Sequence, residues 1–227
     1  MRCPVIAIDG PGGSGKGEIS RRVARRLGWH LLDSGALYRL VALEALRNDV
    51  AIDDAGRLAT LASDLDVSFS QAADGSDVIR LDGHDVAEEI RSEACGSVAS
   101  QIAPLAPVRE ALLGLQRSFQ QPPGLVADGR DMGSIVFPGA ELKIFLTASA
   151  EERARRRYKQ LKEKGIDVSL AALSAELAER DRRDAERQVA PLKPAPGAQI
   201  LDTTRLNIEE TVAEVLRLAA GNRLSAN

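Results

Sequence analysis

A glycine-rich stretch at residues 10–17 most constrains what this chain can fold into, because it joins two segments of different periodicity. Before it, residues 4–8 form a short apolar run that predicts a buried strand. After it, Ile19, Val23 and Leu27 recur every four residues, which predicts a helix that Gly28 can end. A strand, a glycine loop, a lysine and a helix in this order are the context of a phosphate-binding loop.

The chemistry of this loop suits an anion. Glycines allow consecutive backbone N–H groups to turn inward, the helix N-terminus adds partial positive charge, and Lys16 adds a full one. We therefore predict that the loop binds nucleotide phosphates. The residues predicted to do so are Gly10, Pro11, Gly12, Gly13, Ser14, Gly15, Lys16, Gly17 and Glu18.

Position 17 departs from the general motif, which has Ser or Thr after the lysine to ligate Mg²⁺. Gly17 lacks that hydroxyl. The metal would then be held mainly by substrate phosphates and water, with a carboxylate elsewhere, and we predict no set of protein metal ligands. In having Lys-Gly at this point the chain resembles nucleoside monophosphate kinases.

Composition excludes several other classes of protein. No run of 18 apolar residues occurs, and the N-terminus enters its predicted strand too early for a signal peptide. Cys3 and Cys95 are the only cysteines and lack metal-ligand spacing, so we expect a reduced, cytoplasmic setting. A net charge of −3 argues against a nucleic-acid surface. We expect no nucleic-acid partner, no membrane partner and a monomer.

Short apolar runs alternate with helical periodicities along the chain, which is typical of a parallel sheet. We predict one α/β domain over residues 1–227, with a parallel five-stranded sheet in three layers. The predicted strands are 4–8, 29–32, 125–127, 141–146 and 199–201. After the first helix, further helices are predicted at 36–47, 53–65, 86–102, 108–119, 149–164, 169–187 and 207–219.

One segment has the two-residue period of a β-hairpin. Residues 67–70 alternate apolar and polar residues, and the mainly apolar run at 78–81 follows a turn at Asp74-Gly75. A local antiparallel hairpin within alternating strands and helices indicates an insertion. We place this inserted subdomain, with its small antiparallel sheet, at about residues 36–105.

The positions of the arginines carry more information than their number. Arg outnumbers Lys by 24 to 6, a bias that a GC-rich genome would also produce. In the helix predicted at 169–187, however, an apolar stripe continues as a charged one, whereas a solvated helix would place its charges on the opposite side. This pattern indicates a face that lines a cleft. The stripe runs through Leu170, Leu173, Leu177, Arg180, Asp184 and Arg187.

Two more sets of arginines fit the same site. Arg39 and Arg130 each follow a predicted strand end, on the side where ligands bind in such sheets. Three arginines of the preceding helix share one face, although their helix also offers ordinary surface ion pairs with Glu151 and Glu152. These three are Arg153, Arg156 and Arg157. Guanidinium groups grip phosphate bidentately and stay charged, so together these residues predict a site for several phosphates.

These motifs, taken in order over essentially the whole chain, resemble the motif set of bacterial cytidylate kinases. Besides Lys16-Gly17, the matching segments are 33–39 (Asp-Ser-Gly-Ala-Leu-Tyr-Arg), 128–133 (Asp-Gly-Arg-Asp-Met-Gly), 152–157 (Glu-Arg-Ala-Arg-Arg-Arg) and 179–184 (Glu-Arg-Asp-Arg-Arg-Asp). The resemblance implies a P-loop kinase fold with an acceptor-binding insertion and lid helices at about 150–190. It also implies transfer of phosphate from ATP, with Mg²⁺, to CMP or dCMP in pyrimidine metabolism.

The resemblance implies roles for individual residues. Lys16, Arg130, Arg156, Arg157, Arg180 and Arg187 would act on the phosphates in catalysis, and Arg153, Arg156 and Arg157 would belong to a mobile lid that closes over ATP. Ser34, Tyr38 and Arg39 would line the CMP site, with Arg39 and Arg130 on its phosphate. Ser100, Arg109 and Asp131 would read the cytosine edge, and Arg180 and Asp184 would hold the ribose hydroxyls.

Glu18 departs from the family pattern, which usually has Thr or Ser there. A carboxylate cannot donate to phosphates and adds repulsion, so we expect weaker ATP binding or slower turnover than a Glu18→Thr variant would show.

Three alternatives remain open at this level. A P-loop GTPase would need an Asn-Lys-x-Asp motif, yet no Asn here precedes a Lys. A shikimate-like alcohol kinase could use Asp33 as its base but would not explain the insertion or the arginines. A nucleotide sensor without activity is the third.

Overall fold

The computed structural model describes residues 3–71, 77–163, 165–187 and 189–224. The chain forms two compact units. The first consists of Met1–Asp33 and Arg117–Asn227, and the second of Ser34–Gln116. The predicted turn at Asp74-Gly75 lies outside the described residues.

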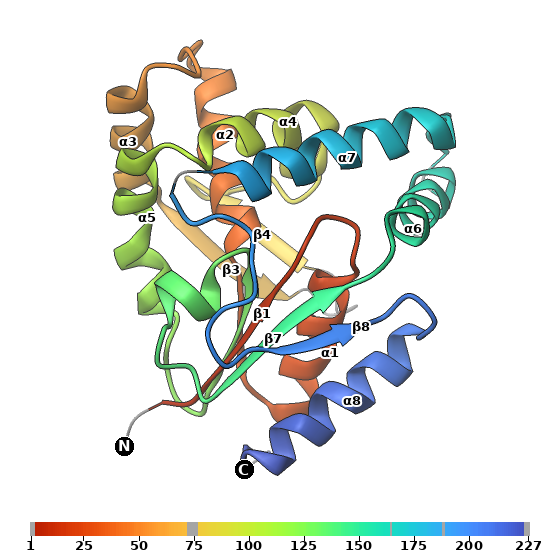
Figure 1. The fold of residues 1–227 in the computed structure, drawn as a ribbon. Coiled ribbons are helices and arrows are strands. Elements are labelled where there is room, and N and C mark those ends of the chain that lie inside the picture. Colours follow the sequence, from red (N-terminus) through yellow and green to blue (C-terminus); the bar gives the residue numbers. More distant parts are fainter. Residues whose placement is uncertain (1–2, 72–76, 164, 188, 225–227) are drawn as a thin grey trace. The chain divides into compact units, whose positions relative to one another are not determined.

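The first unit is built on a parallel sheet of five strands in the order β2-β6-β1-β7-β8 (Figure 1). Its strands are β1 (Val5–Asp9), β2 (His30–Asp33), β6 (Leu125–Gly129), β7 (Leu142–Thr147) and β8 (Gln199–Asp202). The predicted parallel five-stranded sheet is therefore confirmed. All strands run the same way, so the ends of β1, β6 and β2 lie at one edge.

Two helices cover one face of this sheet. Helix α1 (Lys16–Leu27) and helix α8 (Ile208–Gly221) contact each other and lie side by side in Figure 1. Val23 of α1 and Val215 of α8 are fully buried with Ile6 and Ile144 of the sheet. Gly28 ends α1 in the left-handed conformation, as predicted, and Asn207 caps α8 in a capping box with Glu210.

The remaining helices of this unit differ little from the predicted ranges. Helix α6 (Ala150–Glu163) packs against α7 (Leu170–Glu186), whose N-cap is Ser169. A short π-helical turn, η2 (Met132–Val136), was not predicted. It follows β6 directly and is held by buried contacts that the sequence pattern does not reveal.

The second unit contains a three-stranded antiparallel sheet, β3-β4-β5, and helices packed around α2. The predicted hairpin corresponds to β3 (Val67–Gln71) and β4 (Asp77–Leu81), to which β5 (His84–Asp85) adds a third strand. The other elements are α2 (Ser34–Arg47), α3 (Ala55–Ser63), η1 (Glu89–Arg91), α4 (Glu93–Ile102) and α5 (Ala106–Ser118).

Three predicted helix starts in the second unit were wrong. A single helix at 86–102 does not form, because β5 and η1 precede α4 and Ser92 caps a new helix there. Helix α2 begins at Ser34, before the predicted start at residue 36. Helix α3 begins at Ala55, after the predicted start at residue 53, and its cap is Asp54, whose side chain accepts from Arg57 N.

Candidate active site

The glycine loop follows β1 and leads into α1, as its sequence context predicts. A Cβ atom built onto Gly10 would lie 2.0 Å from the carbonyl oxygen of Leu146 in β7, so only glycine fits beside that strand. Gly15 precedes α1 with φ of +88°, a left-handed conformation that glycine adopts without strain. The loop thus turns over the end of β1 and presents the N-terminus of α1.

Lys16 extends across the loop and is only 6% exposed. Its Nζ atom donates to the carbonyl oxygen of Pro11 at 2.8 Å and to Ser14 Oγ at 3.4 Å. Ser14 is itself buried and donates to the same carbonyl at 3.0 Å. These two loop oxygens hold the ammonium at the loop, where its third N–H group is left for another acceptor.

The charge of Lys16 is destabilised where it lies. Burial, first, and then the neighbouring Arg130 lower the pKa of Lys16 to about 7, although Asp128 opposes this shift. Asp128 lies at the end of β6, and burial raises its pKa to about 7, with Lys16 opposing. A nearby polyanion would stabilise the protonated form of Lys16.

We therefore predict that binding of a nucleoside triphosphate takes up protons between about pH 7 and 8. The folded-state pKa of Lys16 is depressed to about 7, so the free protein carries this proton only partly there, and the bound anion restores it. Titration calorimetry with a non-hydrolysable ATP analogue, in buffers of different ionisation enthalpy, measures the uptake. Net proton release in this range, or an unchanged uptake in Lys16→Met, would contradict the prediction.

Arginines from three elements lie against the loop. A Cβ atom built onto Gly12 would lie 3.9 Å from Nη2 of Arg130 and 3.8 Å from Cδ of Arg180. One built onto Gly15 would lie 3.9 Å from Nη1 of Arg156. The structure thus brings these three predicted residues to the glycine loop, from beyond β6, from α7 and from α6.

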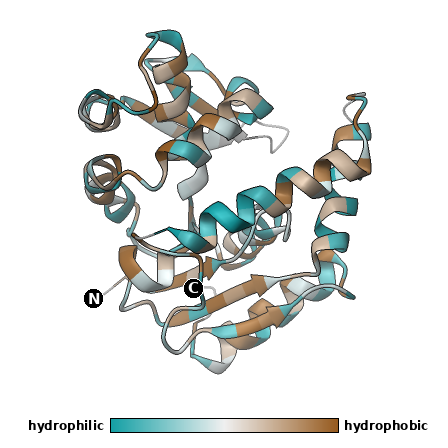
Figure 2. Ribbon diagram, turned by 45° about the horizontal axis from the view of Figure 1, so that its top comes forward, coloured by the Kyte–Doolittle hydropathy of each residue, from teal (hydrophilic) through white to brown (hydrophobic). Residues whose placement is uncertain are grey.

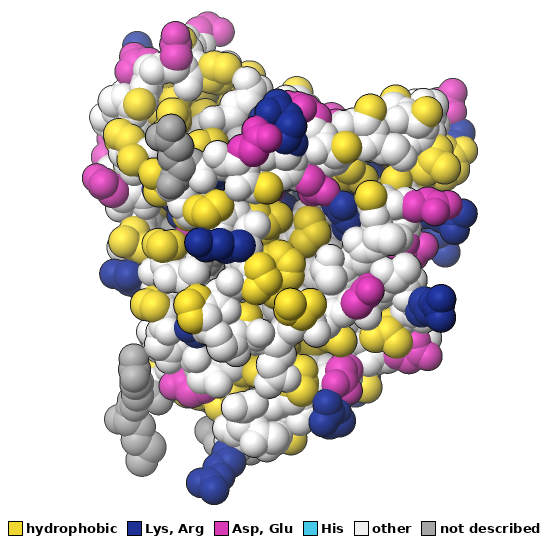
Figure 3. Space-filling view, viewed as in Figure 1, with side chains coloured by type: hydrophobic (Ala, Val, Ile, Leu, Met, Phe, Trp, Pro, Cys, Tyr) yellow, Lys and Arg dark blue, Asp and Glu magenta, His cyan; other side chains and the backbone are white. Residues whose placement is uncertain are grey.

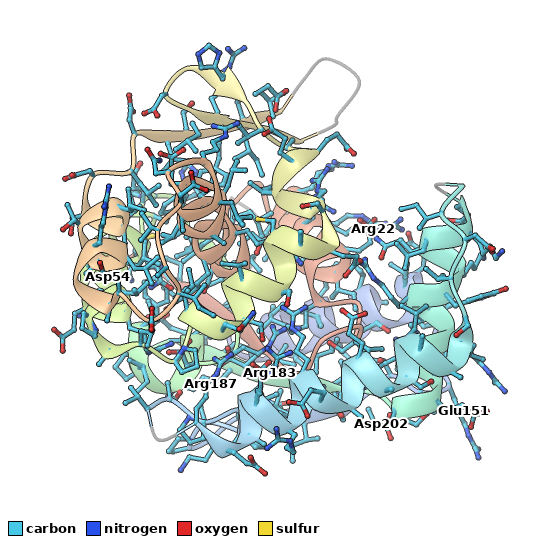
Figure 4. All side chains as sticks on the ribbon, turned by 90° about the horizontal axis from the view of Figure 1, so that it is seen from above. Arg22, Asp54, Glu151, Arg183, Arg187 and Asp202 are labelled. Carbon is cyan, nitrogen blue, oxygen red and sulfur yellow. The ribbon has the colours of Figure 1, made fainter. Side chains whose placement is uncertain are left out.

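Within the charged part of the α7 stripe Asp184 is buried, as its register predicts, while Arg180 and Arg187 are half-buried and Leu170, at the apolar start, is exposed. Asp184 is 1% exposed and accepts hydrogen bonds from Arg130 Nε at 3.0 Å and from Arg187 Nη2. Figure 2 shows hydrophilic residues gathered toward the C-terminal part of α7, and Figure 4 labels Arg183 and Arg187 there. Arg130 and Arg187 hold the pKa of Asp184 below its ordinary value despite burial.

The three predicted arginines of α6 differ in their surroundings. Arg153 is buried, donates to the carbonyl oxygens of Ala148 and Gly12, and pairs with Asp181 of α7 at 2.6 Å. Arg156 donates to Ser14 O and Thr203 O and pairs with Glu152. Arg157 donates to Gln160 of its own helix. Arg153 and Arg156 thus fasten α6 to the loop.

In the second unit, the predicted acceptor residues lie on helices α2, α4 and α5. Arg109 of α5 donates to the hydroxyl of Tyr38 in α2 at 3.2 Å. Arg39 donates to the carbonyl oxygen of Ile90 at 2.7 Å. Ser34 and Ser100 are buried, and the Ser100 hydroxyl has no hydrogen-bond partner among the residues that the structure describes. A buried hydroxyl without a partner is able to bind a polar ligand.

The sequence reasoning missed Asp9 as a site residue. Its carboxylate is buried at the end of β1 and accepts from the backbone N–H groups of Met132 and Gly133, each at 2.8 Å. It therefore holds the turn that carries the predicted Asp131, which is also buried. Burial raises the pKa of Asp9 to about 6, against the effect of these two hydrogen bonds. The sequence signal that could have identified Asp9 is an acidic residue directly after the apolar run of the first strand.

The described residues contain no group of three or more His, Cys, Asp or Glu side chains that could hold a metal ion. One carboxylate does lie at the position where the loop motif lacks its hydroxyl, since a Cβ atom built onto Gly17 would be 3.4 Å from Asp128 Oδ2. This arrangement fits a metal that is held mainly by other oxygens, with one carboxylate nearby.

On the face drawn in Figure 3, basic side chains are interspersed with acidic ones and form no large basic patch. Within the described part of the chain, no helix is long and apolar enough to cross a membrane.

The parallel sheet, the glycine loop after β1 and the buried lysine define a protein of the P-loop kinase class. A solved structure of a protein from Eubacterium ventriosum shares this fold, with a TM-score of 0.51 and 10% identity over 96% of this chain and 98% of that one. The family model for cytidylate kinase matches residues 6–221. The chain belongs to the cytidylate kinase family.

Curated relatives agree with this assignment. A cytidylate kinase from Stutzerimonas stutzeri is 57% identical, covering 98% of this chain and 97% of its own. One from Pseudomonas aeruginosa is 58% identical, covering 94% of each chain. The resemblance inferred from the motifs is therefore confirmed.

Proposed function

We propose that this protein transfers the γ-phosphoryl group of ATP to CMP or dCMP, giving ADP and CDP or dCDP. The observation that carries the proposal is the gathering of Lys16, Arg130, Arg156 and Arg180 at one glycine loop in a chain of this family. The donor triphosphate would lie in the loop, on the N–H groups at the start of α1.

This reaction needs little help from a general base. The acceptor oxygen belongs to a phosphate that is already ionised at neutral pH, so catalysis must chiefly bring two polyanions together and absorb charge on the transferred group. Lys16, Arg130, Arg156, Arg157, Arg180 and Arg187 are the cations we propose for this task. Bound Mg²⁺ would supply further positive charge on the phosphates, and Asp128 is the carboxylate we propose to assist it.

We propose a role in binding the acceptor nucleotide for each residue that the motif resemblance identifies. Arg39 and Arg130 would bind its phosphate, and Arg180, Asp184 and Arg187 its sugar and phosphate side. Ser34, Tyr38, Ser100 and Arg109 would also contact this nucleotide. We also propose that the protein acts as a cytoplasmic monomer without a nucleic-acid or membrane partner. Its net charge of −3 argues against a nucleic-acid partner.

Base selection provides a direct prediction. A carboxylate such as Asp131 accepts from the N4 amino group of cytosine, whereas uracil presents an oxygen there and would be repelled. Asp131→Ala is expected to lower the ratio of kcat/KM for CMP to that for UMP by about tenfold or more, since one good base contact is worth roughly 1–3 kcal/mol. Steady-state kinetics with both acceptors measure this ratio. An unchanged ratio would remove Asp131 from base recognition.

The function itself is tested by a coupled assay of ADP release with CMP, dCMP, UMP, AMP, shikimate or no acceptor. We expect turnover with CMP and dCMP that far exceeds the rate without acceptor. Turnover with shikimate would favour the alcohol-kinase alternative, and ADP release independent of acceptor would favour an NTPase. Binding of ATP without turnover in any mixture would indicate a sensor.

A further inference from the structure

Glu18 places a negative charge in the first turn of the helix that begins at the phosphate-binding loop. A carboxylate here is stabilised by the helix dipole, but it competes with a bound anion for the same positive potential. At about 0.1 M salt the screening length is about 10 Å, so a charge one turn from the loop still acts on phosphates there. A triphosphate site beside Glu18 therefore needs a group that offsets the charge of this carboxylate.

The Glu18 carboxylate is held by two arginines on the following turn of α1. Its Oε2 atom accepts from Arg21 Nη1 at 2.8 Å, and its Oε1 atom accepts from Arg22 Nε at 2.6 Å. Both carboxylate oxygens are thereby engaged by groups that lie farther along the helix than Glu18 itself. The side chain is directed along α1 by these bonds.

Arg22 also reaches the first turn of α8. Its Nη1 atom donates to Glu209, which is bound in turn by Arg26 Nη2 at 3.4 Å. Figure 4 labels Arg22 on α1. The result is a row of alternating charges, which we call the α1–α8 charge row: Arg21, Glu18, Arg22, Glu209 and Arg26. Arg22 is its central member because it contacts both carboxylates.

We propose that Arg22 is a positioning residue for the donor nucleotide: it directs the Glu18 carboxylate away from the glycine loop and offsets its charge. Arg22 then matters for ATP only because Glu18 is present. This inference rests on the proposed use of the loop by ATP, but it does not depend on which acceptor receives the phosphate.

A double-mutant cycle tests this dependence. ATP affinity is measured by titration calorimetry without acceptor for wild type, Arg22→Gln, Glu18→Gln and the double variant, followed by KM for ATP and kcat. We expect Arg22→Gln to weaken ATP binding about fivefold and to raise KM for ATP equally, with kcat changed by less than about twofold. Glu18→Gln is expected to bind ATP up to about twofold more tightly, and the double variant to match it within about twofold.

Arg25→Gln is the matched control, because Arg25 carries the same charge on an exposed position of the same helix, outside the charge row. It is expected to leave ATP affinity unchanged. An equal effect of Arg22→Gln with and without Glu18→Gln would overturn the proposal, since Arg22 would then act on the nucleotide directly. An effect of Arg25→Gln as large as that of Arg22→Gln would overturn it as well.

The same measurements separate this inference from the proposed function. If the effect of Arg22→Gln on ATP affinity depends on Glu18 but CMP is not phosphorylated, the proposed function is overturned and the role of Arg22 is supported. If CMP is phosphorylated but the effects of the two substitutions on ATP affinity are additive, the role of Arg22 is overturned and the proposed function is supported. No ATP binding by the wild-type protein would overturn both.

Discussion

Lys16→Met is expected to lower kcat/KM by about 10²–10³-fold, the loss seen when one preorganised donor is removed from a developing oxyanion. The substitution keeps the length of the side chain but removes the charge that Nζ presents at the loop. Most of the loss is expected in kcat, because the transferred phosphoryl group gains charge on its equatorial oxygens only in the transition state. Steady-state kinetics with ATP and CMP measure it.

The same variant is expected to melt at a temperature at least as high as wild type at pH 7. Burial lowers the pKa of Lys16 to about 7, which means that its protonated form lowers the free energy of unfolding. Replacing Lys16 with an apolar side chain removes this destabilisation. A large loss of activity together with a lower melting temperature would indicate general unfolding and contradict this account.

Asp184→Asn is expected to destabilise the fold by about 3–5 kcal/mol, the usual cost of leaving buried charges without their partner. The carboxylate lies between Arg130 and Arg187, and all its negative charge is removed while its shape is kept. The measurement is the free energy of unfolding in urea at pH 7. Glu186→Gln is the matched control on the same helix, because its pair with Arg182 is exposed and is worth at most about 1 kcal/mol.

The pH dependence of this difference has a definite sign. The folded-state pKa of Asp184 lies below its ordinary value of 3.8, so its contribution is fully present above about pH 4 and is lost as pH falls through the folded-state pKa. The gap between wild type and Asp184→Asn should therefore be constant from pH 7 to 5 and narrow only in stronger acid. A gap that closes near pH 6 would exclude Asp184 as its source.

Much of the site could be read from local patterns because those patterns report physical constraints on short segments. The helical period alone was enough to predict the stripe that ends in Arg180, Asp184 and Arg187, and Asp184 is buried in the structure. The glycine loop required only the order of strand, turn and helix. In contrast, β5 and η1 were missed, since a strand of two residues has no detectable period and depends on its pairing with β4.

The sequence by itself determined the parallel α/β class, the glycine loop at the end of β1 and the family, because periodicity and motif spacing are properties of the chain. Only the tertiary structure decided which charges meet. Asp9 holding the Asp131 turn, Arg153 fastened to Gly12 and Arg22 shared by Glu18 and Glu209 join residues from different elements. Such pairs are set by three-dimensional packing and burial, which no local pattern specifies.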